Sequence, residues 1–553
     1  MGTYAKALDK TFWKRVREAD AYAGHRADLQ KHWDAHCTSP IPELSYNLFK
    51  QYYVNGDRRT YERVYFSRRQ GLNAACFMAL LYPEKEEYLA RAQEHLFSIL
   101  NEYTWVLPAH QPTLESFNPV HIDLFAAETA LNVSEVYMLL GERLDPFLRR
   151  RIREELRRRI LEAYLARPVR GWETAATNWT AVCTCGVAVA IMNVFPKEAE
   201  TLISRFVAAA ENYLTGFGED GFCPEGPMYW AYGFGFFTAL AERLRSFCGI
   251  DLFKNTKVER MAAFFQKIYL CKDVEVTFAD ADMGNRYNHG IMHFLHREYP
   301  NSVTVPPACY GCYTDRMARM CLHLRAFLWF DPEIQPGDAL GVHYGADVQW
   351  LIARHEEFGF AAKAGHNDEP HNHNDIGSFI FAKNGRQVIT DPGRAQYCRD
   401  YFDNATRYGF LHTSSRGHSV PIVGGQYQKP GREYCAKDAL WDGSTFSMEL
   451  ADAYRVEGLQ SLKRSFRVTD SGVILTDRIE STTPVTERFI SQELPALEPG
   501  ILRWADTEMT FSPALMPTVT TESATIEGGK TQTLYLIDIS LPEGHDEFTA
   551  VIL

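Results

Sequence analysis

Apolar side chains are spaced in two different ways along the 553-residue chain, and the change falls near residue 330. Before it they recur every three or four positions over long segments, as in FNPVHIDLFAAETALNVSEVYMLLGERL and GFGFFTALAERLRSFCGI. This spacing places the apolar side chains on one face of a helix. We therefore predict that residues 1–335 are all helical and form packed helix pairs joined by short loops.

From about Val348 onward, the apolar runs shorten to the length of strands and are separated by Gly, Asp, Asn and Pro. Examples are VQWLIA, SFIFAKNGRQVITDPG, SVPIVGG, GVILTDRIE and QTLYLIDISL. Such runs indicate β-strands joined by tight turns. We predict an antiparallel β-sandwich over residues 336–553, with the segment DPEIQPGDALGVHYG as the linker between the two domains.

Charge and hydropathy limit the classes of partner. The net charge of −12 argues against a nucleic-acid or membrane surface, because both partners attract basic proteins. It leaves room for an anionic substrate in a locally basic cleft. The first residues, MGTYAKALDKTFWKRVREAD, contain no apolar run of signal-peptide length, and no segment approaches the roughly 20 apolar residues of a membrane span. We therefore expect a cytoplasmic enzyme.

The densest group of chemically active side chains is HNDEPHNHNDIGSF. If HNHND is extended, His371, His373 and Asp375 project from the same face of a strand. Two imidazoles and a carboxylate suit zinc or a similar divalent ion. Asp391 in VITDPG and His418 in SRGHSV could complete such a site. The alternative is a loop whose polar residues cap turns.

These motifs carry a resemblance to a known family. EPHNHNDIGSFIF, followed by VITDPG and GHSVPIVGG, resembles the C-terminal domain of the heparinase II/III-like polysaccharide lyases. TNWTAVCTCG around Asn178 and DGFCPEGPMYWAYG around Tyr229 resemble two signatures of that family's helical domain. The resemblance implies an α+β multidomain fold, in which an (α/α) toroid, an incomplete barrel, precedes an antiparallel β-sandwich. It places the active cleft between the two domains.

The resemblance also implies β-elimination at a uronic acid, which leaves a 4,5-unsaturated uronate. The reaction must neutralise the uronate carboxylate, remove the proton at C5 and protonate the leaving oxygen at C4. By motif position, Asn178 is the neutralising residue and Tyr229 the acid. His371 either stabilises a Tyr229 phenolate or acts as the base, depending on the C5 epimer. Asn178 could instead cap a helix.

A metal site follows from the same resemblance. The implied ligands are His373, Asp391 and His418, which leaves His371 for catalysis. The implied ion is divalent, zinc in the first place and manganese as the alternative. Because the elimination needs no activated water, we expect this ion to brace the cleft wall rather than to take part in the reaction.

Further residues resemble substrate-binding positions of the family. Tyr232 could instead be a packing residue, Glu225 could fix the loop that presents Tyr229, and Arg407 could form a structural salt bridge. The full set of implied substrate-binding residues is Trp105, His110, Asp123, Trp179, Glu225, Tyr232, Arg407 and Tyr408.

The expected partner is an anionic oligo- or polysaccharide that contains uronic acid. We favour glycosaminoglycans (heparan sulfate or heparin, chondroitin sulfate, hyaluronan), because the chain has no room for the additional N-terminal β domain of some exolytic alginate lyases. Alginate is the alternative substrate. Two other classes stay open: a glycoside hydrolase with paired carboxylates such as Asp280 and Asp282, and a glycan-binding protein without activity.

Overall fold

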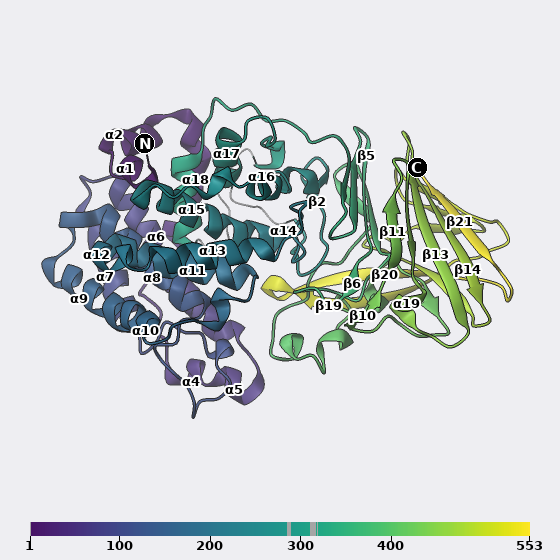
Figure 1. Cartoon of the computed structure of the whole chain (residues 1–553), viewed down its shortest axis with the longest axis horizontal. Helices are drawn as coiled ribbons and strands as arrows, with labels where there is room; N and C mark the ends of the chain where they lie inside the picture. Colours follow the sequence, from purple (N-terminus) through teal and green to yellow (C-terminus); the bar gives the residue numbers. More distant parts are fainter. Residues whose placement is uncertain (1, 285–288, 310–316, 318) are drawn as a thin grey trace.

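The computed structural model describes residues 2–284, 289–309, 317 and 319–553. Figure 1 shows helices in one half of the molecule and sheets in the other. The helices run from α1 (Thr3–Ala7) to α18 (Met320–Trp329), and the sandwich strands run from β3 (Gly341–Gly345) to β21 (Glu547–Ile552). The predicted order of a helical part followed by antiparallel sheets is confirmed.

The helical domain is an (α/α) toroid. Its inner helices contact one another in succession, and helices of an outer layer pack against them. Long apolar segments such as that of α11 are buried nearly all round, as expected for helices in a core. The inner helices are α6 (Arg59–Leu81), α8 (Leu124–Leu140), α11 (Asn178–Val194), α15 (Gly235–Cys248) and α18. The outer layer includes α7 (Glu86–Leu100), α9 (Pro146–Leu156) and α13 (Ile203–Thr215).

The other helices of this domain are shorter or lie at its edge. They are α2 (Lys10–Glu18), α3 (Ala23–His36), α4 (Tyr46–Phe49), α5 (Gln51–Asn55), α10 (Glu162–Leu165), α12 (Pro196–Glu200), α14 (Pro227–Tyr229), α16 (Thr256–Ala262) and α17 (His289–Glu298). Within the described residues, every helix is too short or too polar to traverse a bilayer.

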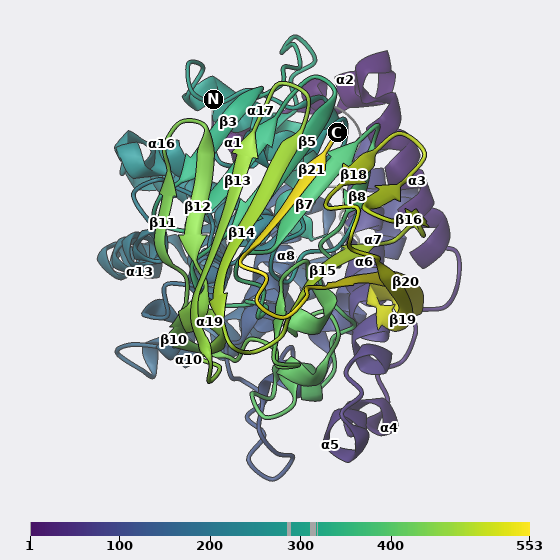
Figure 2. The same ribbon diagram turned by 90° about the vertical axis from the view of Figure 1, so that its right-hand side faces the viewer.

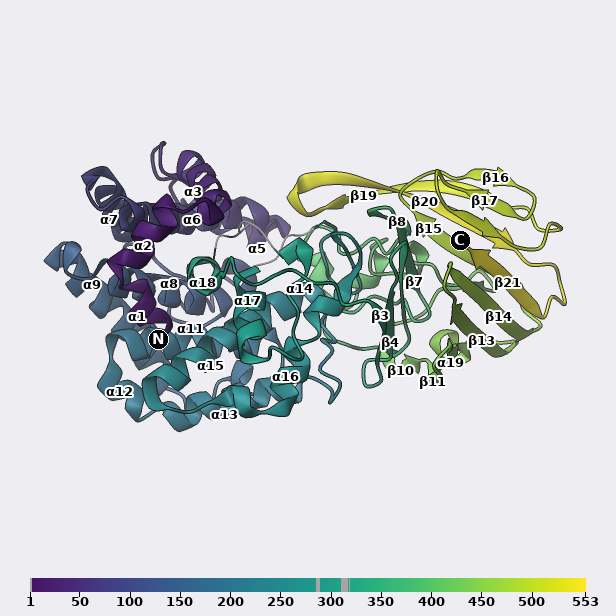
Figure 3. The same cartoon turned by 90° about the horizontal axis from the view of Figure 1, so that it is seen from above.

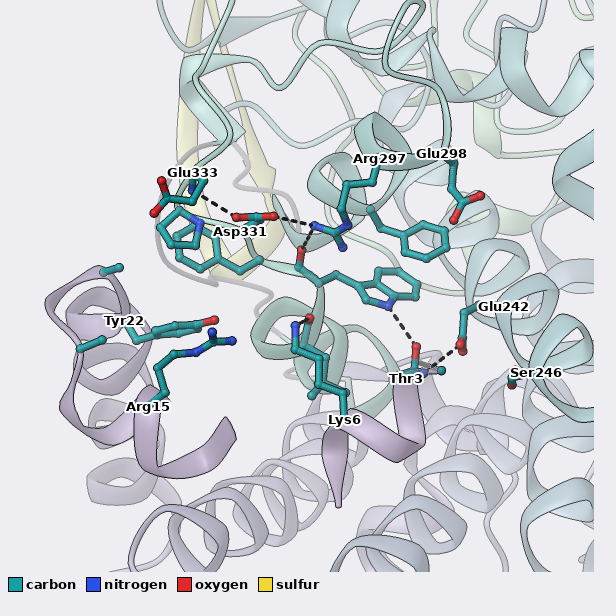
Figure 4. A pocket seen from close by; sticks show the side chains of 18 of the residues that line it. Thr3, Lys6, Arg15, Tyr22, Glu242, Ser246, Arg297, Glu298, Asp331 and Glu333 are labelled. Carbon is teal, nitrogen blue, oxygen red and sulfur yellow. Dashed lines mark hydrogen bonds and ion pairs between the residues drawn. The ribbon is translucent and has the colours of Figure 1, made fainter. Parts of the chain in front are cut away.

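The N-terminal helix α1 packs beside α18, at the end of the helical domain's chain. The Thr3 amide donates to Glu242 at 2.9 Å, and the Trp329 indole donates to the Thr3 hydroxyl at 3.1 Å (Figure 4). A cavity of about 750 Å³ lies here. It is lined by charges of both signs, such as the pair Arg297–Asp331 at 3.6 Å, and by none of the predicted site residues. These contacts hold the N-terminal segment against α15 and α18.

The prediction that the first 335 residues are all helical is wrong at one point. β1 (Tyr269–Cys271) and β2 (Val274–Glu275) form an antiparallel hairpin within this half. The hairpin packs against the sandwich, where a Cβ at Gly359 would lie 2.3 Å from the Leu270 carbonyl oxygen. Three apolar residues are too few to show a period of either kind, so tertiary contact decides the conformation here.

The C-terminal domain contains sheets of five, eight and four strands, whose described neighbours pair antiparallel. The five-stranded sheet consists of β3, β4 (Trp350–Arg354), β5 (Phe358–Lys363), β7 (Phe379–Lys383) and β8 (Arg386–Ile389). In order, the eight-stranded sheet is β11 (Lys437–Trp441), β12 (Thr445–Glu449), β13 (Leu459–Val468), β14 (Val473–Ser481), β21, β18 (Glu508–Thr510), β17 (Ile501–Arg503) and β16 (Ala496–Glu498). The four-stranded sheet is β19 (Thr518–Ile526), β20 (Lys530–Ser540), β15 (Val485–Ser491) and β9 (Ile422–Val423). β10 (Gly431–Cys435) pairs with β6 (His366–Asn367).

The five-stranded sheet is the middle layer of the molecule, with the eight-stranded sheet outside it (Figure 2). Along β4, Trp350 and Ile352 belong to the core shared with the helical domain, whereas Leu351 and Ala353 belong to the core between the sheets. Side chains alternate between the faces of a strand. Burial on both faces therefore explains why VQWLIA is an uninterrupted apolar run.

Candidate active site

A cavity of about 1400 Å³ lies between the two domains. Asn178 and Tyr229 line it from the helical domain, and His371 lines it from the sandwich domain. The three residues that the sequence predicted as catalytic thus meet at one cavity. Its lining is also rich in guanidinium groups: Arg58, Arg59, Arg319, Arg394 and Arg399.

Asn178 is the first residue of α11. The N-cap residue is Thr177, so Asn178 does not have the capping position that was the alternative to a catalytic role. The Asn178 backbone amide donates to Glu225 Oε1 at 2.9 Å, and its side-chain amide donates to Glu225 Oε2 at 2.5 Å. Burial raises the pKa of Glu225. Asn178 Oδ1 is buried and has no hydrogen-bond partner among the described residues. The side chain is therefore held rigidly, with its carbonyl oxygen and the second N–H of its amide left for a ligand.

Tyr229 ends the short helix α14, just before a π-helical turn, Trp230–Phe234, that leads into α15. Its ring stacks on His371 with a centroid separation of 3.9 Å and an interplanar angle of 17°. Its hydroxyl lies 2.8 Å from that of Tyr397. Burial, helped by the negative charge of Asp280, raises the pKa of Tyr229 above its ordinary value. The hydroxyl therefore keeps its proton and can donate it.

Asp280 organises the site and was missed as such by the sequence analysis. Its carboxylate is fully buried, accepts from His371 Nδ1 at 2.8 Å, and lies at hydrogen-bond distance from further donors. Burial alone would raise its pKa, but the Arg407 charge and the two histidine hydrogen bonds hold it well below its ordinary value. The partners, all from the sandwich domain, are His371, His373, Tyr397, Tyr401 and Arg407.

The loop that carries Asp280 belongs to the helical domain and is docked onto the sandwich by backbone contacts. The Arg394 amide donates to the Ala281 carbonyl at 2.9 Å, and the Thr277 hydroxyl donates to the Asp391 carbonyl at 2.9 Å. Gly393 has a φ of +65°, and a Cβ there would lie 2.3 Å from the Ala281 oxygen. Only glycine permits this approach. The site is thus assembled by the contact between the domains.

The segment HNHND is not extended, contrary to the prediction. His371 has a φ of +62°, and the next strand, β7, begins at Phe379. A non-glycine residue in this region is strained, and such strain is concentrated at functional sites. Asp375 does not belong to the group of residues that could share a metal ion and pairs instead with Lys363 at 2.6 Å. His371 and His373 nevertheless converge, because each donates to a different oxygen of Asp280.

Three buried residues could hold a metal ion: His373, Asp391 and His418, whose ligand atoms lie within 4.8 Å of one another. His373 Nε2 is bonded to Asp280 at 3.1 Å, which leaves its Nδ1 without a partner among the described residues. His418 Nε2 bonds the His412 carbonyl at 2.7 Å, so its Nδ1 faces Asp391. Metal-bound histidines commonly show this pattern of one ligating and one anchored nitrogen.

Of the predicted substrate-binding residues, His110, Trp179 and Tyr232 line the cavity. The His110 ring lies 5.0 Å from Trp179 and is held by Asp123 through a contact of 2.7 Å to Nδ1. Asp123 itself is fully buried and caps α8, so it positions His110 and does not reach the cavity. Tyr232 donates its hydroxyl to Glu128.

Besides Asp123, four other predicted contacts with substrate do not fit the structure. Trp105 is 1% exposed, and its indole is bonded to the Ile99 carbonyl, so no face is left for a sugar. Arg407 is buried against Asp280 and two backbone carbonyls, the structural alternative that the sequence allowed. Tyr408 bonds Asn372 outside the cavity. Glu225 holds Asn178 and lies behind it.

The sequence analysis missed several residues that line the cavity. Tyr397 joins Tyr229 to Asp280, since its hydroxyl also lies 3.1 Å from Asp280 Oδ2. Arg394 pairs with Asp282 at 2.9 Å and lies over the Tyr397 ring. Their sequence context, GRAQYCRD, has no spacing that separates cleft residues from ordinary surface residues.

Comparisons with known proteins agree with this architecture. Residues 339–538 match the family model described as heparinase II/III-like, C-terminal. The solved structure of a heparinase III has a TM-score of 0.64 at 13% identity, over 100% of this chain and 93% of that one. The structure of a heparan sulfate lyase from Pedobacter heparinus has a TM-score of 0.61 at 13% sequence identity, over 100% of this chain and 86% of that one.

A chondroitin AC lyase from Streptomyces coelicolor, solved with chondroitin sulphate, gives a TM-score of 0.56 at 12% identity, over 99% of this chain and 82% of that one. A search among curated proteins found no match. At these identities the structural matches establish the fold. Residues 339–538 thus match the C-terminal domain of the heparinase II/III-like proteins, and along its whole length the chain has the toroid-and-sandwich fold of these lyase structures.

Proposed function

We propose that the protein is a polysaccharide lyase that cleaves uronic-acid-containing glycans by β-elimination. The observation that carries this proposal is the convergence of Asn178, Tyr229 and His371 on one arginine-lined cavity between the domains. The match of residues 339–538 to the heparinase II/III-like C-terminal domain supports it.

The geometry suggests a role for each group. Asp280 accepts a hydrogen bond from His371 Nδ1, which leaves Nε2 of the ring to act as the base for the C5 proton. Tyr229, stacked on that ring, would donate its proton to the oxygen that leaves C4. The base His371 and the acid Tyr229 lie side by side. This arrangement suits a sugar whose C5 proton and C4 leaving oxygen are on the same face of the ring. Asn178 would stabilise the charge that develops on the uronate carboxylate.

A glycosaminoglycan is the substrate class that we favour, with alginate as the alternative. The described cavity lining holds five arginines beside four acidic residues, although the chain has a net charge of −12. Guanidinium groups bind carboxylate and sulfate groups through paired hydrogen bonds. The hydrolase alternative is weakened, because Asp280 is fully buried among five partners and Asp282 is paired with Arg394. Asp280 does not belong to the cavity lining, and Asp282, which does, has its carboxylate engaged by a guanidinium group.

The function is tested by following the ultraviolet absorbance of the unsaturated uronate. Purified protein is incubated with heparan sulfate, heparin, chondroitin sulfates, hyaluronan and alginate, each as polymer and as short oligosaccharides. We expect absorbance to rise on at least one glycosaminoglycan. New reducing ends without absorbance would instead establish hydrolysis, and binding without either signal would establish a glycan-binding protein.

We also propose that His373, Asp391 and His418 hold a divalent ion, zinc first and manganese as the alternative. The bound ion would fix the loop that presents His371. We expect chelation, or His373→Ala, to lower the melting temperature, because an ion that binds only the folded state at about 100 times its Kd adds about 2.7 kcal/mol. Elemental analysis and thermal unfolding measure this. His545→Ala, on an exposed loop, is the control, and a metal-free protein of unchanged stability would contradict the proposal.

A further inference from the structure

The hairpin of β19 and β20 reaches from the sandwich towards the helical domain (Figure 3). Residues 535–540 of β20 pair with β15, whereas residues 530–534 pair with β19 alone. The end of the hairpin is therefore a two-stranded ribbon that projects beyond its sheet. Its tip lies at the cavity, because Glu527 and Gly528 belong to the cavity lining together with Arg58 and Arg59 of the helical domain.

Glu527 at the tip joins the two domains. Its Oε1 lies 3.8 Å from Arg59 Nε, and its Oε2 lies 3.3 Å from Arg394 Nη1. Gly528 and Gly529 follow, with φ of +86° and +74°. Both values lie in the region that favours glycine, so the ribbon can reverse directly behind the carboxylate. The charge of Glu527 is thus presented to two arginines of the cavity.

The neighbouring loop of the sandwich makes a second bridge to the same place. Arg59 Nη1 donates to Gln396 Oε1 at 2.5 Å, and the Arg399 amide approaches the Gly56 carbonyl at 3.4 Å. The Gln396 amide also donates to the Thr525 carbonyl at 2.9 Å, so that loop and hairpin act as one unit. The two domains are thus bridged by hydrogen bonds at the place where the hairpin tip meets the cavity.

We propose that the β19–β20 hairpin closes one end of the cleft, so that the site takes the end of a glycan chain and cleavage is exolytic. This inference rests on the proposed lyase function. A polymer can be cut in its interior only if it leaves the cleft at both ends. With Arg59 bound to both Glu527 and Gln396, one exit is blocked by the protein itself.

The bridge is made by half-exposed side chains outside the sandwich core, so it can be altered without loss of that core. The side chains of Arg59 and Glu527 are 31% and 29% exposed. Two cross-strand pairs, Thr525↔Thr531 and Ile526↔Lys530, lie next to the tip, and Thr525 and Ile526 make the contacts of the hairpin with the loop at Ala395 and Gln396, so their removal withdraws the whole bridge. Deleting these four residues removes two from each strand. Because side chains alternate between the two faces of a strand, the remaining residues keep their faces.

The test compares the wild-type protein with this shortened hairpin and with Glu527→Ala on a long polymer that gives absorbance. Glu543→Ala, an exposed acid in the loop before β21, is the control for the lost charge. Product sizes and viscosity are followed against absorbance. For the wild type we expect the smallest unsaturated product from the first time points and little loss of viscosity. For the shortened hairpin we expect products of intermediate size and a several-fold larger viscosity loss at equal absorbance.

Intermediate products from the wild type, or an unchanged pattern in a folded shortened variant, would overturn the inference and leave the lyase function intact. The absence of unsaturated product on every uronate glycan would overturn the proposed function, and the inference with it. If the shortened chain does not fold, the wild-type protein and Glu527→Ala provide the test. Exolytic products from the wild type, with products of intermediate size added in Glu527→Ala, would support a closed cleft end. Endolytic products from the wild type would refute it.

Discussion

Replacing Tyr229 with phenylalanine is expected to lower kcat by about 10²–10⁴-fold, the usual contribution of a positioned acid or base. The phenyl ring can keep its stacking on His371, at a centroid separation of 3.9 Å. What is lost is the hydroxyl, whose proton is retained because burial raises the pKa of Tyr229. Affinity for an oligosaccharide, measured by calorimetry, should change little, because the other cavity residues remain.

A change of leaving group separates the acid role from the base role. A substrate whose C4 substituent leaves as a stable anion, such as an aryl oxide, needs no protonation, so Tyr229→Phe should recover much of its rate on it. A variant that stays slow on such a substrate would show that Tyr229 removes the C5 proton instead. Tyr46→Phe, at a side chain that is 66% exposed, is the matched control. Full activity of Tyr229→Phe on natural glycans would contradict both roles.

The sequence predicted those parts of the fold that depend on local pattern. The helical period in residues 124–140 and the strand-length runs around residues 379–389 are both found as elements. Asn178, Tyr229 and His371 could be found because each lies in a short motif. Their chemistry is encoded within a few neighbouring residues, so no knowledge of distant contacts was needed.

The parts that could not be predicted depend on contacts between distant segments. Asp280 is separated from its partners by 91 to 127 positions in the chain. In FADADMG it looks like any acidic loop residue, and burial among sandwich residues is what gives it its function. The prediction for Trp105 failed in the opposite way: its resemblance to a substrate-binding position suggested contact with a sugar, whereas packing makes it part of the core. Sequence identifies an aromatic residue but not the face that it exposes.

Replacing Asp280 with asparagine is expected to destabilise the folded protein by about 3–5 kcal/mol, the usual cost of breaking a buried ion pair from one side. Arg407 would keep a buried charge without its carboxylate at 3.1 Å. His371 would also lose the acceptor that fixes its ring, so activity should fall even in the folded fraction. Differential scanning calorimetry and the absorbance assay, run at a temperature where the variant is folded, measure the two effects separately.

The control is Asp470→Asn, the same change at an exposed position in the turn between β13 and β14, which should leave both quantities unaltered. Asp280 comes from the helical domain, and its five partners come from the sandwich. Loss of its charge should therefore weaken the contact between the domains, and the calorimetric transition should broaden or split as they unfold apart. A single, unshifted transition with full activity would show that Asp280 is dispensable, and the positioning of His371 would then have to come from its stacking on Tyr229.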